Sequence, residues 1–115
     1  MAVKFECVNI SSKDPERLAR FYETIGVRVS VQDPNYDGWQ LRNADGEPYV
    51  CVWDEHKWGR STAGYITIVL KAEDLQKTYE EIKSKGISID LPRRADWGGQ
   101  ELVLNDPDGN VVMIL

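Results

Sequence analysis

The chain repeats one pattern of secondary-structure signals at an offset of 60 residues, which is its strongest constraint on the fold. The offset runs from Asp14 to Asp74 and from Gly26 to Gly86, and each Asp follows a short alternating apolar segment, 7–10 or 67–70. A further alternating segment follows each glycine. This spacing predicts two copies of one supersecondary unit rather than a single irregular core.

Each copy carries the signals of one amphipathic helix. Asp14 followed by Pro15 is typical of a helix start, with Asp as the N-cap and Pro at the first helical position. Asp74 has the same role in the second copy, and a glycine after the last apolar residue ends each helix. The helices are expected to begin at 15 and 75, with apolar stripes formed by Leu18, Phe21, Tyr22, Ile25, Leu75, Tyr79 and Ile82.

Short alternating segments around each helix predict four strands per copy, and hence an α+β fold of two βαβββ modules. The strands are expected at about 7–10, 27–31, 38–42, 48–53, 67–70, 87–91, 101–104 and 111–115. Alternation assigns Val8, Ile10, Val50 and Val52 to the helix side, and Cys7, Asn9, Tyr49, Cys51, Trp53 and Thr67 to the opposite side. Residues 1–115 then form one domain, with modules at about 1–54 and 64–115 and a polar linker at about 55–63.

Composition and charge narrow the partners and the location. A net charge of −5 argues against a nucleic-acid partner and favours a cationic ligand. No apolar run approaches the roughly 20 residues of a membrane span, and the first residues do not resemble a signal peptide, so the expected location is the cytoplasm. Two cysteines in 115 residues do not make a disulfide framework.

The sequence Asp-Pro-Asp-Gly-Asn at 106–110 predicts a tight β-hairpin between two apolar strands. This hairpin, the helix motif at 14–26 and the repeat together resemble the glyoxalase/bleomycin-resistance/dioxygenase superfamily, also called the vicinal oxygen chelate fold. The resemblance covers essentially the whole chain. It implies that the eight strands form a cup-like sheet with the helices on its convex side, and that two chains form a homodimer.

The resemblance also indicates where the metal enzymes of the superfamily carry their ligands, typically His and Glu. Those positions are Cys7, Thr67, Met113 and either Cys51 or Val50 here. None of these residues supplies an imidazole or a carboxylate, so we expect no metal and no cofactor. A soft ion such as Cu(I), bound by the cysteines and Met113, is the alternative. His56, the single histidine, lies in the polar linker.

Without a metal, the chain resembles the branch of drug-binding proteins related to bleomycin resistance. Trp97-Gly98 shortly before Glu101 is similar to the stretch that precedes the hairpin in those proteins. The leading hypothesis is a protein that sequesters an aromatic, cationic compound such as an antibiotic. The residues expected to contact the ligand are Cys7, Asn9, Trp39, Tyr49, Cys51, Trp53, Thr67, Trp97, Glu101 and Met113.

Two other functions stay open at this point. One is a glyoxalase-type lyase or another enzyme of the superfamily, with non-standard site residues or with Cys7 as a nucleophile. The other is a non-catalytic fold whose aromatic residues only form the dimer interface. Trp39 shares a strand face with Leu41, so it is also a candidate core residue. The shape of the pocket is expected to depend on the loops at 32–38 and 92–99.

Overall fold

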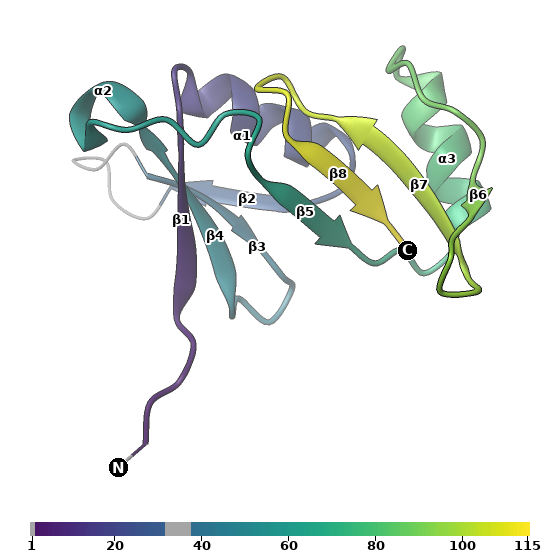
Figure 1. The fold of residues 1–115 in the computed structure, drawn as a ribbon, viewed down its shortest axis with the longest axis horizontal. Coiled ribbons are helices and arrows are strands. Elements are labelled where there is room, and N and C mark those ends of the chain that lie inside the picture. Colours follow the sequence, from purple (N-terminus) through teal and green to yellow (C-terminus); the bar gives the residue numbers. More distant parts are fainter. Residues whose placement is uncertain (1, 32–37) are drawn as a thin grey trace. The chain divides into compact units, whose positions relative to one another are not determined.

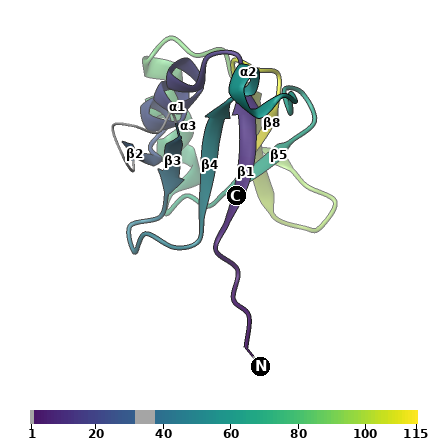
Figure 2. The ribbon, with the colours of Figure 1, turned by 90° about the vertical axis from the view of Figure 1, so that its left-hand side faces the viewer.

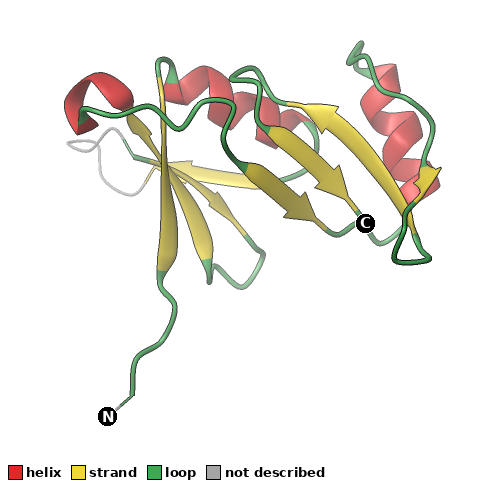
Figure 3. Cartoon of the chain, in the orientation of Figure 1, coloured by secondary structure: helices red, strands yellow, loops and turns green. Residues whose placement is uncertain are grey.

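The computed structural model describes residues 2–31 and 38–115, and the chain divides into two compact units, Met1–Ala63 and Gly64–Leu115. Of the expected pocket loop at 32–38, only Gly38 lies within the described residues. Figures 1 and 3 show that each unit has a helix packed on a sheet. Neither of the two longer helices, nor the one-turn helix, is long and apolar enough to cross a membrane, in a search limited to the described residues.

Unit 1 contains a four-stranded sheet in the order β1-β4-β3-β2. Strand β1 runs parallel to β4, and the other neighbours are antiparallel. Figure 2 shows β1 beside β4, with the preceding segment extending past the sheet. The elements are β1 (Cys7–Ser12), α1 (Pro15–Thr24), β2 (Arg28–Val31), β3 (Trp39–Arg42), β4 (Tyr49–Asp54) and α2 (Glu55–Trp58).

Unit 2 repeats this topology with its own four strands, in the order β5-β8-β7-β6. Again the first strand is parallel to the last one, and the remaining pairs are antiparallel. The elements are β5 (Thr67–Leu70), α3 (Leu75–Ser84), β6 (Arg93–Arg94), β7 (Gln100–Asn105) and β8 (Val111–Ile114). The α+β class and the two βαβββ modules are therefore confirmed, whereas the cup shape stays a prediction.

The predicted helix starts are correct, and the capping bonds explain them. An Asp14 side-chain oxygen accepts a bond from the Arg17 backbone nitrogen at 3.1 Å, and Asp74 accepts from Lys77 in the same way at 3.0 Å. The apolar stripes then pack inward. In unit 1 the buried core includes Ile10, Leu18, Ala19, Tyr22, Leu41 and Val52, and in unit 2 Tyr79, Ile82, Leu102, Leu104 and Val112.

The expected strand at 87–91 is wrong, because these residues have no regular secondary structure. The strand that pairs with β7 is the two-residue β6, with Arg93 opposite Glu101 and Arg94 opposite Gln100. A strand needs a backbone partner as well as an alternating pattern, and the turn just after β6 sets which residues meet β7. The expected linker at 55–63 also begins with the one-turn helix α2.

Candidate functional site

One side of the unit-1 sheet collects five of the predicted site residues. We call this side the thiol–aromatic face, formed by Cys7, Asn9, Tyr49, Cys51 and Trp53. Cys7 lies opposite Tyr49 in the β1–β4 register, and Asn9 lies opposite Cys51. Val50 points to the other side of the sheet, the side of Ile10 and Val52, since side chains alternate along a strand. Of the two candidate positions on β4, Cys51 is therefore the one that shares a face with Cys7.

The two thiols on this face have different surroundings. Cys51 is only 3% exposed, whereas Cys7 is half-buried, with its Sγ 3.7 Å from Asn9 Oδ1. Burial raises the pKa of the Cys51 thiol to about 11, and the nearby Cys7 adds to the shift. Partial burial also raises the pKa of Tyr49, with a hydrogen bond to Cys7 as the next cause. Cys51 is thus a neutral thiol near pH 7, not a reactive thiolate.

Aromatic rings extend this face toward α2. The Trp53 and Trp58 ring centroids are 6.1 Å apart, with an angle of 44° between the planes. The Arg42 guanidinium carbon lies 4.7 Å from the Tyr49 ring centroid, and its Nε donates to Gln40 Oε1 at 2.6 Å. Such an arrangement offers stacking surfaces with a fixed cation beside them.

Gln40 and Arg42 belong to the thiol–aromatic face, although they were not among the predicted site residues. Gln40 lies opposite Cys51 in the β3–β4 register, and Arg42 lies opposite Tyr49. The signal was present in the sequence, because alternation along β3 separates them from Trp39 and Leu41.

Trp39 lies on the other side of the same sheet, together with Leu41. It pairs with Val52 in the register, and the Arg20 guanidinium carbon of α1 lies 4.9 Å from its ring centroid. The structure therefore separates Trp39 from the thiol–aromatic face, and we leave it out of the candidate site.

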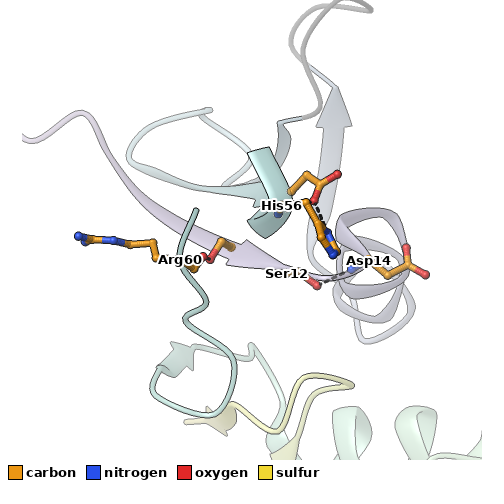
Figure 4. A network of polar contacts seen from close by, with 6 residues as sticks. Ser12, Asp14, His56 and Arg60 are labelled. Atoms are coloured by element: carbon orange, nitrogen blue, oxygen red, sulfur yellow. Dashed lines mark hydrogen bonds and ion pairs between the residues drawn. The ribbon is translucent and has the colours of Figure 1, made fainter. Parts of the chain in front are cut away.

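Polar contacts at the end of β1 hold the segment around α2 (Figure 4). Asp54 caps α2 by accepting from the His56 backbone nitrogen at 2.9 Å, and the His56 ring nitrogen Nδ1 lies 3.1 Å from the same carboxylate oxygen. The hydrogen bond from the His56 backbone nitrogen lowers the pKa of the Asp54 carboxyl, and the contact with the His56 ring lowers it further. Ser11 Oγ donates to the Arg60 carbonyl at 2.6 Å. His56 thus contacts a helix cap, and its side chain is 75% exposed.

Apolar side chains gather on one side of the unit-2 sheet. We call it the Val69 face, formed by Thr67, Val69, Val103, Val111 and Met113. Met113 lies between Val69 and Val103 in the register, and Thr67 lies opposite Val111. Val69 is 55% exposed. Two predicted site residues, Thr67 and Met113, therefore share this face.

Glu101 lies on β7, and alternation puts its side chain on the same side of the sheet as Val103. It is buried, and among the described residues it has one ion-pair partner, Arg93. Its Oε1 accepts from Arg93 Nε at 3.0 Å, and the residue is only 5% exposed. Its Oε2 is buried and has no hydrogen-bond partner within the part of the chain that the structure describes. A buried carboxylate oxygen without a donor is costly, so this atom is suited to a donor supplied by a ligand or by water.

Trp97 lies in the turn between β6 and β7. It is 61% exposed, so much of its indole is open to a planar molecule. In unit 2 the predicted residues Thr67, Met113, Glu101 and Trp97 are therefore distributed over one sheet face and the turn that leads into it.

The side chains at the superfamily's metal-ligand positions do not fit a divalent metal. Within residues 2–31 and 38–115, no group of three or more His, Cys, Asp or Glu side chains could hold a metal ion. Thr67 and Met113 supply a hydroxyl and a thioether, and the buried Cys51 keeps its proton. Hard and borderline divalent ions prefer carboxylate and imidazole ligands, so we derive no metal-dependent chemistry for this site.

Comparison with known proteins agrees with this architecture. The family model described as Glyoxalase/Bleomycin resistance protein/Dioxygenase superfamily matches residues 4–114. A bleomycin resistance protein of Klebsiella pneumoniae is 28% identical over 116 residues, covering 93% of this chain and 87% of that protein.

Solved structures give the same result over nearly the full length. A bleomycin-binding protein complexed with bleomycin is 25% identical, with a TM-score of 0.70 and coverage of 98% of this chain and 97% of that one. A lactoylglutathione lyase from Agrobacterium tumefaciens is 15% identical, with a TM-score of 0.75 and coverage of 99% and 94%, which shows the fold alone. The chain belongs to the glyoxalase/bleomycin resistance protein/dioxygenase superfamily.

Proposed function

We propose that this protein binds and sequesters an aromatic, cationic antibiotic of the bleomycin type, without a metal ion. The observation that carries the proposal is that unit 2 offers both an open indole, at Trp97, and a buried carboxylate oxygen, Glu101 Oε2, that has no hydrogen-bond partner among the described residues. An aromatic ring and a carboxylate together recognise a planar compound that also carries a positive charge. The protein is expected to act as a homodimer in the cytoplasm.

Stacking, a cation over a ring and a hydrogen bond to Glu101 would each contribute to the affinity for such a drug. Stacking on one aromatic ring contributes about 1 kcal/mol beyond area burial, and a cation over the ring adds a similar amount. A charge-assisted hydrogen bond to Glu101 Oε2 would supply the donor that this oxygen lacks among the described residues. We expect these contacts, together with the apolar area that a bound ring system buries, to give micromolar affinity, about −8 kcal/mol.

Relatives support an antibiotic as the ligand. The bleomycin resistance protein of Klebsiella pneumoniae and the bleomycin-binding protein solved with bleomycin are 28% and 25% identical to nearly all of this chain. A bleomycin resistance determinant encoded on the transposon Tn5 is 26% identical, with a TM-score of 0.70 over 97% of this chain. No comparable observation favours an enzyme, since the lyase neighbour is only 15% identical.

Titration with bleomycin, followed by tryptophan fluorescence, tests the proposal. We expect saturable quenching, and we expect Trp53→Ala or Trp97→Ala to weaken binding about tenfold. Trp39→Phe is the matched control, because Trp39 lies on the helix side of the unit-1 sheet beside Arg20. Its affinity should remain that of the unmodified protein.

Two outcomes would overturn the proposal. One is the absence of saturable binding with bleomycin and with a panel of planar cationic drugs. The other is a measurable turnover that Cys7→Ser abolishes, which would support an enzyme that uses Cys7.

A further inference from the structure

The turn between β6 and β7 has the geometry of a tight hairpin. Its three-residue loop is Asp96–Gly98, closed by the Ala95 backbone nitrogen, which donates to the Gly99 carbonyl at 2.8 Å. The Gly98 backbone nitrogen donates to the Ala95 carbonyl at 2.9 Å, and Gly98 has φ +97°. A positive φ at the end of such a loop favours glycine, and the two backbone bonds define the turn that carries Trp97.

The Trp97 indole lies directly against the backbone of Gly99. A Cβ atom placed on Gly99 would be 2.0 Å from Trp97 Cη2, 2.0 Å from Cζ3 and 2.9 Å from Cε3. These separations are far below van der Waals contact, so the ring occupies the volume that any side chain at 99 would need. Trp97 is nevertheless 61% exposed, so the ring is held from one side and open elsewhere.

We propose that Gly99 is a positioning residue of the ligand site, whose missing side chain lets Trp97 rest on the backbone as a preformed stacking surface. The inference builds on the proposed function, because it assigns how one of its aromatic contacts is prepared. An indole that already rests against the Gly99 backbone has fewer conformations to lose when the ligand arrives, and preorganisation of this kind increases affinity. Gly99 acts through Trp97 and does not itself need to contact the ligand.

Trp53 of the thiol–aromatic face, in unit 1, also lies close to a glycine. A Cβ atom on Gly38 would be 3.2 Å from Trp53 Cη2 and 2.9 Å from Cys51 Sγ. The Trp53 ring is thus farther from Gly38 than the Trp97 ring is from Gly99, and a side chain at 38 would also meet the buried Cys51 thiol. We therefore test the inference at Gly99, where the ring alone is affected.

The position of the indole can be tested without a ligand. The chain has four tryptophans, so protein labelled with 5-fluorotryptophan should give four ¹⁹F NMR resonances, and Trp97→Ala identifies the one from Trp97. We expect Gly99→Ala to shift the Trp97 resonance, whereas Gln100→Ala, an exposed neighbour in the same hairpin, leaves it in place. An unchanged Trp97 resonance in Gly99→Ala would overturn the inference.

A double-mutant cycle with bleomycin tests whether Gly99 acts through Trp97. We expect Gly99→Ala to weaken binding about tenfold, and Trp97→Ala/Gly99→Ala to bind within about twofold of Trp97→Ala alone. If Gly99→Ala weakens binding by the same factor in both backgrounds, Gly99 acts independently of the ring and the inference is wrong.

The outcomes separate this inference from the proposed function. If the unmodified protein binds no bleomycin, the proposed function fails, and the ¹⁹F spectra still decide whether Gly99 positions the indole. If Gly99→Ala alone does not fold, the double variant should fold, because the clashing ring is absent. A double variant that also fails to fold would contradict the inference.

Discussion

Asp106 and Asn110 bind each other across the turn between β7 and β8. One Asp106 carboxylate oxygen, Oδ2, accepts from the Asn110 side-chain amide at 3.0 Å, and the other accepts from the Asn110 backbone nitrogen at 2.9 Å. The Asn110 side-chain oxygen then accepts from the backbone nitrogens of Gly64 and Ile66, at 2.8 and 3.3 Å. The hairpin that indicated the superfamily therefore also fixes the segment that leads into β5.

We expect Asn110→Ala to destabilise the protein by about 2 kcal/mol, because it leaves several buried groups without partners. Asn110 is fully buried, so water does not replace the lost bonds. Urea unfolding measures the change, and Asn105→Ala, at an exposed position of β7, is the control. A loss of stability no larger than that of the control would contradict this role.

Cys51 should make the protein less stable in alkaline solution. Its pKa is about 11 in the folded state against an ordinary value of 9.0, so between these pH values the unfolded state loses a proton that the folded state keeps. The free energy of unfolding therefore falls as pH rises, by at most about 1.4 kcal/mol per pH unit from this group. The stability that depends on the protonated Cys51 thiol is fully present below pH 9 and is lost by about pH 11.

Comparing the unfolding of the unmodified protein with that of Cys51→Ser over this pH range isolates the effect. The difference in stability between the two should shrink as pH rises. Iodoacetamide at pH 8 should also modify Cys7 before Cys51, since Cys51 is 3% exposed. Equal labelling rates in the folded protein would argue against a buried, protonated Cys51.

Glu101→Gln should weaken the binding of bleomycin about tenfold, because it removes the negative charge while keeping the shape of the side chain. Glu81→Gln makes the same change in net charge at an exposed position of α3 and should have no effect. Isothermal titration calorimetry measures both variants. Equal affinities for Glu101→Gln and the unmodified protein would remove Glu101 from the site.

Protein purified without a chelator should contain no stoichiometric zinc, nickel, manganese or iron. The reason is the donor set, because Cys7, Thr67 and Met113 stand where the superfamily's metal enzymes are expected to place ligands. Elemental analysis measures the content. One metal ion per chain, together with lactoylglutathione formation, would restore the enzyme hypothesis.

The protein should form a homodimer at micromolar concentration, as the superfamily resemblance implies. Large apolar side chains are exposed in both units, among them Phe5 at 70%, Tyr65 at 88% and Val69 at 55%. Exposed apolar side chains of this size are typical of interaction surfaces when they lie together. Light scattering that detects only monomer would remove the dimer prediction without affecting the fold.

Local signals predicted the two longer helices and most of the strands correctly, but not the one-turn helix α2. Asp14 and Asp74 cap the helices as expected, because an N-cap bond involves only residues three apart in the chain. Alternation also predicted which side chains of β1 and β4 share a face, since side-chain direction in a strand depends only on position. The same alternation along β3 would have predicted that Gln40 and Arg42 lie on the thiol–aromatic face.

Pairing between distant segments was harder to predict from the sequence. The alternating residues at 87–91 were expected to form a strand, yet the strand is Arg93–Arg94, because the partner strand and the turn decide where a ladder forms. Trp39 was a candidate for the site on the basis of its residue type. Its contact with Arg20 of α1 is a tertiary feature.

The sequence by itself determined the repeat, the helix caps, the hairpin at 106–110 and the absence of His and Glu from the expected ligand positions, since all of these depend on residue identity and spacing. Only the tertiary structure showed the buried, one-sided pairing of Glu101 with Arg93 and the Trp97 ring lying on Gly99. Burial and close approach depend on which atoms surround a residue in space. Those neighbours come from packing, which no single stretch of sequence specifies.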